Sequence, residues 1–515
     1  MAIPPLDGKS LTICHVYEVA CLNEPVKVAA AARGLMKLSR KLVEKWVRSG
    51  ETIYGVTTGF GEFSTVAIPF SALEALQRNL ILSHSAGTGD PLPPAVIRAM
   101  MLLRANVLVK GFSGVRPELV DYLVRMVNAD ILPVIPRQGS VGSSGDLVPL
   151  SHLGLAMIGK GRVWVRNGRR GYKEASARVG LKKVGLPPLR LTAKEGVALI
   201  NGTEMMTAYT ALAVYQSKKL CKVADIAAAI SVEVLKGSDT AFDERIHNLR
   251  PYAGQKASAR NLQRLIQNSL IRESHRYGDP RVQDAYSLRC APQVHGASRD
   301  AVDYVKSIVS IEINAATDNP LIFADKKLHL EGGNFHGQPI ALAADFLAIA
   351  LAELANISER RIDQMMHSEL SELPKFLTRH GGLNSGMMML QYVAASLVSE
   401  NKVLAHPASV DSIPTSAGKE DHNSMGSIAA QKLWQVLKNT RAVLAIELLV
   451  AAQGLDFHRP LKSGKGVEAA HRFVRKHVKH LGGDRVLAED IQTAVRLVES
   501  GDLLRAVETA VGRLL

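Results

Sequence analysis

The stretch Gly139-Ser-Val-Gly-Ser-Ser-Gly-Asp146 combines small residues and hydroxyl groups at a spacing that permits a backbone reaction. The Gly145 nitrogen has no side chain beside it to shield it, and it can reach the carbonyl carbon of Ser143 through a five-membered ring. Loss of water from that ring and from the Ser144 side chain would leave an exocyclic methylene. This group is a strong electrophile of a type that amino-acid side chains do not supply, so the segment points to an enzyme handling a poorly activated substrate.

A plainer interpretation of this stretch is a loop. Glycine- and serine-rich segments are usually loops, and Ser-Gly-Asp often begins a helix. A phosphate-binding loop is excluded, because no Gly-Lys-Ser or Gly-Lys-Thr follows and the G-x-G-x-x-G spacing is absent. The case for chemistry therefore depends on the polar residues elsewhere in the chain.

Two residues in the N-terminal part of the chain could act on a substrate. Tyr54 opens a glycine-rich loop, in which glycines allow the backbone to approach a ligand closely. It could serve as a general base if its pKa were lowered, and the alternative is a buried structural tyrosine. His84 follows Ser83 at the end of an apolar segment, where it could bind a polar substrate group or be a hydrogen-bonded core residue.

Further candidates lie in the second half of the chain. Gln283, Tyr286 and Arg289 are three residues apart, so a helical turn would project them on one side. The planar guanidinium of Arg289 suits a carboxylate, and the alternative is a surface ion-pair patch. Phe335 could line a pocket or simply pack. Glu420 could bind a cationic ring, transfer a proton, or cap a helix.

The elements that must position these residues are mostly helices. Hydrophobic residues make up 47% of the 515 residues and aromatic residues only 5%, which favours packed helices over a β-sandwich. Residues 162–169 alternate polar and apolar side chains and reach an Asn-Gly turn, which predicts a small hairpin. Apolar periodicity predicts long helices near residues 203–235, 301–316, 338–362, 386–404 and 426–453. We therefore expect a mainly α protein with a long helical bundle in its second half.

Composition excludes several other classes. The cysteines form no C-x-x-C pair, so neither a disulfide framework nor a zinc site is predicted, and a reducing cytoplasm fits best. No H-E-x-x-H occurs, and the histidines at 471, 477 and 480 lie on a strongly basic helix, so no metal is expected. The net charge of +15 is spread along the chain, which favours a solvated basic surface over a nucleic-acid partner. The most apolar helices are short and interrupted by glutamate, so they are expected in the core and not in a membrane.

Taken together, these segments resemble the aromatic amino acid ammonia-lyase and aminomutase family over nearly the whole chain. The matching motifs lie, in order, at residues 54–61, 79–89, 110–116, 139–150, 201–203, 286–296, 317–320, 333–337 and 420–422. The resemblance implies a mainly α, elongated helical-bundle fold of the ammonia-lyase (fumarase/aspartase-like) type. It divides the chain into a smaller mixed N-terminal region with the hairpin, residues 1–200, and a long-helix bundle with a C-terminal helical region, residues 201–515.

The resemblance also implies a cofactor that the chain makes from itself. In the family, the cyclised tripeptide becomes a 4-methylidene-imidazol-5-one (MIO) group, which here would form from Ser143, Ser144 and Gly145. The family usually has alanine at the first of these positions. We expect cyclisation to survive, because the side chain at 143 would merely hang from the ring. A second departure is Lys419, where the members that act on histidine usually have glutamine.

Roles follow from the resemblance residue by residue. The substrate amine adds to the methylene, and a base then removes a β-proton to release an unsaturated acid and ammonia. Tyr54 matches the catalytic tyrosine, and Arg289 matches the residue that holds the substrate carboxylate. Asn201 and Tyr286 match residues that contact the MIO group or assist its function. Further pocket positions are matched by His84 and Glu420, which recognise imidazole in the members acting on histidine, by Gln283, and by Phe335 as a pocket wall.

The pattern is most similar to the family members that act on histidine. Enzymes preferring phenylalanine carry an apolar pair where this chain has Ser83 and His84, and Glu420 would then be an unpaired buried charge. Tyrosine is the second expectation, since His84 could bond the phenol, and an aromatic amino acid 2,3-aminomutase is the third. A different class of protein, an inactive helical scaffold with a decayed MIO site, is a further alternative.

The family assembles as a homotetramer, with each active site built from several subunits. The resemblance therefore implies a cytoplasmic enzyme with a small amino acid substrate, shared active sites, and neither a nucleic-acid nor a membrane partner. Mixed tetramers of two inactive variants are expected to regain activity.

Overall fold

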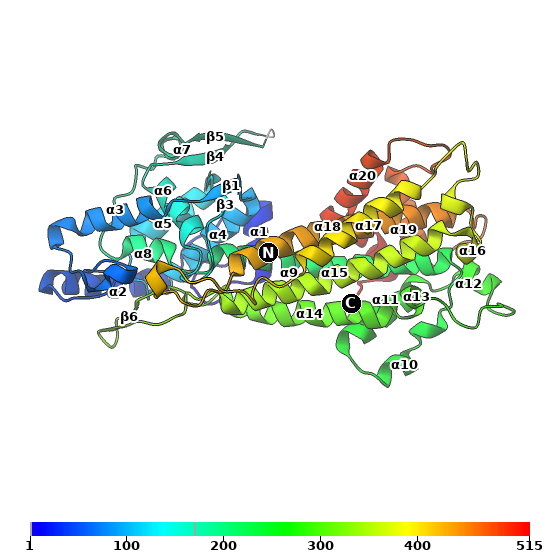
Figure 1. The fold of residues 1–515 in the computed structure, drawn as a ribbon, viewed down its shortest axis with the longest axis horizontal. Coiled ribbons are helices and arrows are strands. Elements are labelled where there is room, and N and C mark those ends of the chain that lie inside the picture. Colours follow the sequence, from blue (N-terminus) through cyan, green and yellow to red (C-terminus); the bar gives the residue numbers. More distant parts are fainter. Residues whose placement is uncertain (1–2, 169–170) are drawn as a thin grey trace. The chain divides into compact units, whose positions relative to one another are not determined.

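The computed structural model describes residues 3–168 and 171–515, and it is mainly helical (Figure 1). Contacts divide the chain into two compact units. The first unit contains Met1–Tyr215, Lys306–Asp345 and Pro407–Gln431, and the second contains Gln216–Val305, Phe346–His406 and Lys432–Leu515. The division is thus not a single cut at residue 200. Several long helices begin in one unit and end in the other, namely α9 (Glu204–Val234), α14 (Ala291–Glu312), α15 (Gln338–Met366) and α18 (Gly426–Asp456).

The first unit holds shorter helices and all the strands of the described chain. Its helices are α1 (Ile13–Leu22), α2 (Ala30–Ser49), α3 (Leu73–His84), α4 (Pro94–Leu108), α5 (Pro117–Asn128), α6 (Leu147–Met157), α7 (Ala177–Lys183) and α8 (Glu195–Ile200). Its strands are β1 (Thr88–Pro91), β2 (Ile131–Pro133), β3 (Pro136–Gln138), β4 (Arg162–Arg166), β5 (Tyr172–Ser176), β6 (Leu321–Phe323) and β7 (Leu328–Leu330). Strands β2, β4 and β5 form one antiparallel sheet, in which Leu132 pairs with Trp164 and Trp164 with Glu174.

The predicted hairpin is the pair β4–β5, although residues 169–170 near its turn lie outside the described residues. Helix α4 lies at the centre of the first unit. It begins with Pro94, whose fixed φ suits a first helical position, and every residue from Val96 to Leu108 is buried. A fully buried helix must pair its charges, and Arg104 does so with Glu204 at 2.9 Å.

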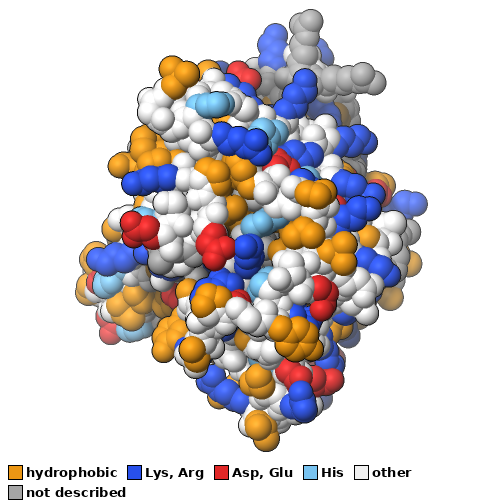
Figure 2. All heavy atoms as spheres, turned by 90° about the vertical axis from the view of Figure 1, so that its right-hand side faces the viewer, with side chains coloured by type: hydrophobic (Ala, Val, Ile, Leu, Met, Phe, Trp, Pro, Cys, Tyr) orange, Lys and Arg blue, Asp and Glu red, His pale blue; other side chains and the backbone are white. Residues whose placement is uncertain are grey.

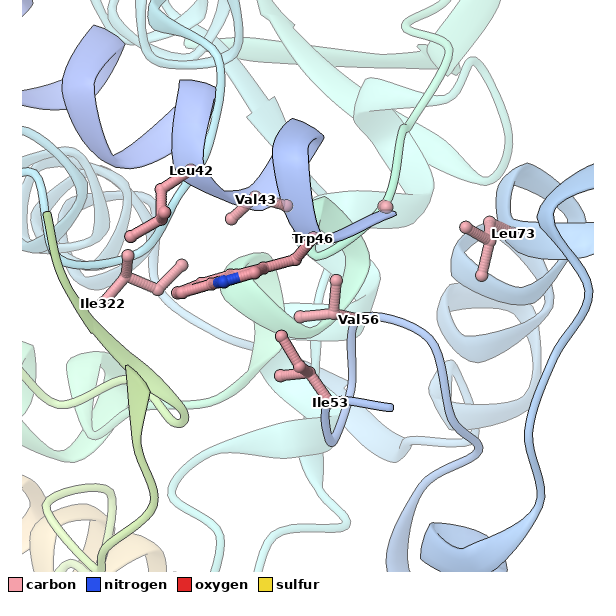
Figure 3. Close-up of a cluster of buried hydrophobic side chains, with 8 residues drawn as sticks. Leu42, Val43, Trp46, Ile53, Val56, Leu73 and Ile322 are labelled. Atoms are coloured by element: carbon pink, nitrogen blue, oxygen red, sulfur yellow. The ribbon is translucent and has the colours of Figure 1, made fainter. Parts of the chain in front are cut away.

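A hydrophobic cluster fixes the loop that carries Tyr54. Leu42, Val43 and Trp46 of α2 pack with Ile53 and Val56, and with Leu73 and Ile322 from more distant segments (Figure 3). Ile53 and Val56 are at most 2% exposed and flank Tyr54 in the sequence. Each fully buried aliphatic side chain contributes roughly 1.5–3 kcal/mol. The backbone at Tyr54 is therefore anchored on both sides.

The second unit is a helical bundle, as the periodicity predicted. Its remaining helices are α10 (Glu244–Asn248), α11 (Ala253–Leu265), α12 (Leu270–Ser274), α13 (Tyr286–Arg289), α16 (Ser368–Ser371), α17 (Met388–Leu404), α19 (Lys465–His477), α20 (Leu487–Ser500) and α21 (Asp502–Val511). Glu447 of α18 accepts hydrogen bonds from Ser231 of α9 at 2.8 Å and from Ser358 of α15 at 2.6 Å. Arg361 of α15 pairs with the same carboxylate, with Nη2 2.9 Å from Oε2, and neither side chain is exposed. One buried carboxylate thus joins three helices of the bundle.

Helix α15 is the described helix that is long and apolar enough to cross a membrane. Two thirds of its most apolar window (67%) is nevertheless buried against the rest of the protein, as in the core helix of a soluble protein. Figure 2 shows one face of the molecule, on which lysine and arginine side chains are interspersed with acidic and hydrophobic ones. Its basic side chains therefore do not gather into a single patch on that face.

Candidate active site

The tripeptide Ser143-Ser144-Gly145 lies in the first unit, in the loop between β3 and α6, and its backbone is held tightly. Gly145 has φ +71°, a left-handed conformation that side chains rarely adopt. The Asp146 amide donates to the Gly202 carbonyl at 2.7 Å, and the Ser140 hydroxyl donates to the Gly145 carbonyl at 3.2 Å. A Cβ at Gly145 would collide with the Gly202 backbone. The third tripeptide position therefore accepts only glycine.

The Asp146 side chain anchors this loop to two helices. Asp146 precedes α6, but its side chain caps a different helix, because Oδ2 accepts the amides of Met205 at 2.9 Å and Met206 at 3.0 Å in the first turn of α9. Oδ1 accepts the Ser427 hydroxyl at 3.0 Å. Complete burial raises the pKa of Asp146 to about 7, against the effect of these hydrogen bonds. The carboxyl group thus joins the tripeptide loop to α9 and α18.

Asn201 makes a direct hydrogen bond to the tripeptide. Its amide Nδ2 donates to the carbonyl oxygen of Ser144 at 3.1 Å. The backbone carbonyl of Asn201 accepts from Arg104 Nη1 at 2.8 Å, and the same guanidinium pairs with Glu204. Since Asn201, Arg104 and Glu204 are all buried, Asn201 is held rigidly on the Ser144 carbonyl.

Glu420 contacts both hydroxyl groups of the tripeptide. Oε1 accepts from Ser144 Oγ at 2.6 Å, and Oε2 accepts from Ser143 Oγ at 3.1 Å. Oε2 also accepts from Thr415 Oγ1 at 2.6 Å. The structure therefore places the Glu420 carboxylate directly on the tripeptide, although Ser144 and Glu420 are 276 residues apart in the chain.

Tyr54 and His84 carry shifted pKa values in the same unit. Burial raises the pKa of the Tyr54 phenol, the charges of Glu331 and Glu420 raise it further, and the Gly61 amide, which donates to the phenol oxygen at 3.3 Å, only partly opposes this. The lowered pKa that a tyrosine base would need is thus absent in this chain. Burial lowers the pKa of His84, whose Nδ1 is 3.0 Å from Ser83 Oγ. At neutral pH, Tyr54 keeps its proton and His84 is uncharged.

Phe335 is half-buried in the turn before α15. The neighbouring Gly337 amide donates to the Gly142 carbonyl at 3.1 Å, which brings this turn to the tripeptide loop. Lys419, the departure next to Glu420, is exposed, and its Nζ lies 3.9 Å from Glu62 Oε2. Its ammonium group therefore points to the loop that follows Tyr54. The described contacts include no hydrogen bond from this ammonium group to Glu420.

Gln283, Tyr286 and Arg289 belong to the second unit, and the predicted helical turn is α13. Arg289 Nη2 donates to Gln283 Oε1 at 2.8 Å, and its guanidinium carbon lies 4.7 Å from the centre of the Tyr286 ring. Helix α13 contains Tyr286 and Arg289, whereas Gln283 lies in a bend before it, so the helical turn predicted from the spacing holds two of the three residues. Tyr286 is 71% exposed, so its ring is available to a ligand or another chain.

Sequence reasoning missed the residues that hold the site together, chiefly Ser140, Asp146, Thr415 and Ser427. Asp146 stood inside the motif, but the pattern indicated an ordinary helix start. Thr415 and Ser427 lie in segments of small residues that give no sign of which hydroxyl is used. Among the described residues, no group of histidine, cysteine and carboxylate side chains could hold a metal ion.

Comparisons with known proteins identify the family of this chain. A family model described as aromatic amino acid lyase matches residues 11–476. A histidine ammonia-lyase of Caldanaerobacter subterraneus subsp. tengcongensis is 52% identical over 496 residues, which cover 96% of this chain and 96% of that protein. The crystal structure of histidine ammonia-lyase from Trypanosoma cruzi has a TM-score of 0.91 and 44% identity, covering 98% of this chain and 95% of that one. A tyrosine aminomutase from Streptomyces globisporus has a TM-score of 0.93 and 38% identity over the whole of both chains. This chain belongs to the aromatic amino acid lyase family.

Proposed function

We propose that this chain deaminates L-histidine without oxidation, giving trans-urocanate and ammonia. The observation that carries the proposal is the position of Glu420, whose carboxylate contacts the hydroxyls of both tripeptide serines. Loss of the Ser144 hydroxyl on ring formation would leave Oε1 without its donor, and a phenyl ring would not replace that donor, whereas imidazole supplies an N–H. The histidine ammonia-lyases that match nearly the full chain support the same substrate.

The tripeptide fits the MIO group of this family. Gly145 is held in a conformation that residues with side chains rarely adopt, and Asn201 bonds the Ser144 carbonyl, whose oxygen is not among those lost as water. When formed, the group would supply an electrophilic carbon that accepts the substrate amine. Asn201 would remain a donor to the same carbonyl and would draw electron density from the electrophile.

The remaining residues divide the proton transfers between them. Tyr54 keeps its proton, so it suits donation to the departing amine. The Glu420 carboxylate accepts its hydrogen bonds from Ser143, Ser144 and Thr415, so it suits acceptance of the β-proton or of an imidazole N–H. His84 is uncharged and can accept or donate to the substrate ring. Phe335 would form a wall of the same pocket.

Arg289, with Gln283 and Tyr286, would hold the substrate carboxylate and complete the site. We propose that these residues act in a cytoplasmic homotetramer whose copies share their active sites. Mixing an inactive Glu420→Gln chain with an inactive Arg289→Lys chain should then restore part of the activity, because some sites receive both native residues. If refolded mixtures stay as inactive as the separate chains, the shared site is wrong.

The proposal is tested by incubating the purified protein with L-histidine and following the ultraviolet absorbance of urocanate, with L-tyrosine and L-phenylalanine in parallel. Urocanate from histidine alone supports the proposal. If the protein converts tyrosine but not histidine, its substrate is tyrosine and the histidine proposal is wrong. A β-amino acid product would instead indicate an aminomutase. An intact mass without the loss of two waters, together with no turnover, would indicate an inactive scaffold.

A further inference from the structure

Ser143 occupies the position at which the family usually has alanine, and its hydroxyl makes a hydrogen bond. Ser143 Oγ donates to Glu420 Oε2 at 3.1 Å, and the Ser143 residue is only 5% exposed. We infer that Ser143 is a positioning residue, which holds one oxygen of the Glu420 carboxylate so that the other oxygen faces the reacting carbon. The inference rests on the proposed function and concerns the geometry of its proton transfer.

The two carboxylate oxygens have different partners, and ring formation would affect only one of them. Oε2 accepts from Ser143 and Thr415, and Oε1 accepts from Ser144 at 2.6 Å. Cyclisation joins the Gly145 nitrogen to the Ser143 carbonyl carbon and releases that carbonyl oxygen as one water. The second water is formed from the hydroxyl group of Ser144 and the proton on its Cα, and the Ser144 Cβ stays as the methylidene carbon. The Ser143 hydroxyl takes no part in either loss.

After ring formation, Oε1 has therefore lost its donor, while Oε2 keeps both of its donors. The freed oxygen is left beside the carbon that carried Ser144 Oγ, which is where a substrate would be bound. A carboxylate held through one oxygen retains its orientation, whereas an unheld carboxylate samples several rotamers.

Thr415 alone cannot provide this orientation relative to the tripeptide, because it belongs to the same loop as Glu420. The Thr415 amide donates to the Glu420 carbonyl at 2.9 Å, so the two residues move together. This loop is largely exposed, and Ser416 and Ala417 within it have positive φ values. Among the described hydrogen bonds, the one from Ser143 is then the remaining link from the Glu420 side chain to the tripeptide.

The other charged and titratable groups around Glu420 do not replace this link. The charge of Glu420 raises the pKa of both Tyr54 and His84, but neither residue has a described hydrogen bond to the Glu420 carboxylate. Lys419 turns to Glu62, with which it forms an exposed pair at 3.9 Å. An exposed pair of this kind constrains side chains weakly.

The test compares Ser143→Ala, which removes the hydroxyl, with Ser143→Thr, which keeps it. We expect both variants to lose two waters by intact mass. For Ser143→Ala we expect kcat to fall about tenfold with KM changed less than about twofold, and the acidic limb of the kcat profile to move about one pH unit upward, as for loss of one hydrogen bond to a charged group. Ser143→Thr should recover most of kcat and the original profile.

Two further measurements use a different signal or a second variant, the first being ligand binding without turnover and the second a double variant. Binding of urocanate without ammonia, measured by calorimetry from pH 6 to 9, should weaken severalfold in Ser143→Ala and recover in Ser143→Thr. Ser143 and Thr415 bond the same oxygen, so adding Thr415→Val to Ser143→Ala should lower kcat by more than the product of the separate effects.

The outcomes separate this inference from the proposed function. A native enzyme that yields no urocanate from histidine contradicts the proposed function itself. An active native enzyme with a Ser143→Ala variant that is cyclised, and equal to it in kcat, pH profile and urocanate binding, overturns the positioning role. A Ser143→Ala variant that retains both waters also overturns it, because Ser143 would then serve ring formation.

Discussion

Replacing Gly145 with alanine would place a methyl group where the backbone of Gly202 already lies. The added Cβ would be 2.8 Å from the Gly202 nitrogen and closer still to its carbonyl carbon and oxygen, whereas ordinary contacts begin near 3.4 Å. The two backbone segments must therefore separate by more than half an ångström, which breaks the bond from the Asp146 amide to the Gly202 carbonyl. The left-handed φ of +71° adds strain of about 1–2 kcal/mol for a residue with a side chain.

A matched control separates the strain from the collision. Gly50, which follows α2, has φ +73°, but a Cβ there meets nothing within 4 Å. Gly50→Ala should thus cost about 1–2 kcal/mol, while Gly145→Ala should cost about 2–4 kcal/mol, because a buried hydrogen bond is lost as well. Thermal unfolding gives the order of the two effects, and intact mass gives their chemical consequence.

We expect Gly50→Ala to lose two waters and to keep its turnover of histidine. Gly145→Ala should keep the full mass of its sequence and form no urocanate, because the displaced nitrogen no longer meets the Ser143 carbonyl carbon. The reasoning is refuted if Gly145→Ala loses both waters, or if the two variants lower the melting temperature equally.

Three other variants test single contacts. The folded pKa of Asp146, about 7, lies above its ordinary 3.8, so its contribution to stability is greatest below pH 4 and falls by up to about 4 kcal/mol as the pH rises to 7. Asp146→Asn should therefore flatten the dependence of the melting temperature on pH between these values, and an unchanged slope would contradict the raised pKa. Arg104→Met leaves Glu204 buried without its partner and should destabilise the protein by about 3–5 kcal/mol in denaturant unfolding, whereas a loss below about 1 kcal/mol would show that the pair is dispensable. Lys419→Gln removes an exposed pair with Glu62 and should change kcat/KM for histidine less than about fivefold, and kcat/KM of this variant should depend less on salt than that of the native enzyme. A change of preferred substrate would show that Lys419 reaches the pocket.

The fold was predictable where one physical signal dominates. Long apolar periodicity placed α9, α15, α17 and α18 within a few residues of their observed bounds, and an Asn-Gly turn placed the β4–β5 hairpin. Periodicity missed the start of α14, which begins at Ala291, because its first turns bury polar residues such as His295. Local patterns also cannot show that residues 306–345 and 407–431 pack with the first unit, since that depends on long-range contacts.

The sequence predicts candidate residues for the chemistry of the site, but it does not predict the residues that hold them in place. Tyr54, Ser144 and Glu420 lie in motifs whose chemistry can be predicted from the types of their residues. The hydrogen bond from Ser143 to Glu420 spans 277 residues, so no local pattern could indicate it. The same holds for the raised pKa of Tyr54, which arises from burial in the folded chain. Types of residues thus predict the chemistry, while burial and long-range contacts decide protonation and orientation.

The buried carboxylate of Glu447 also bears on how this sequence can diverge. Loss of either Arg361 or Glu447 alone leaves an unpaired charge with no access to water, at a cost of about 3–5 kcal/mol, which is comparable with much of a domain's net stability. A lineage that changes one residue first therefore passes through a poorly folded intermediate. Relatives should keep both residues or change them together, with Ser231 and Ser358 drifting only after the charge has gone.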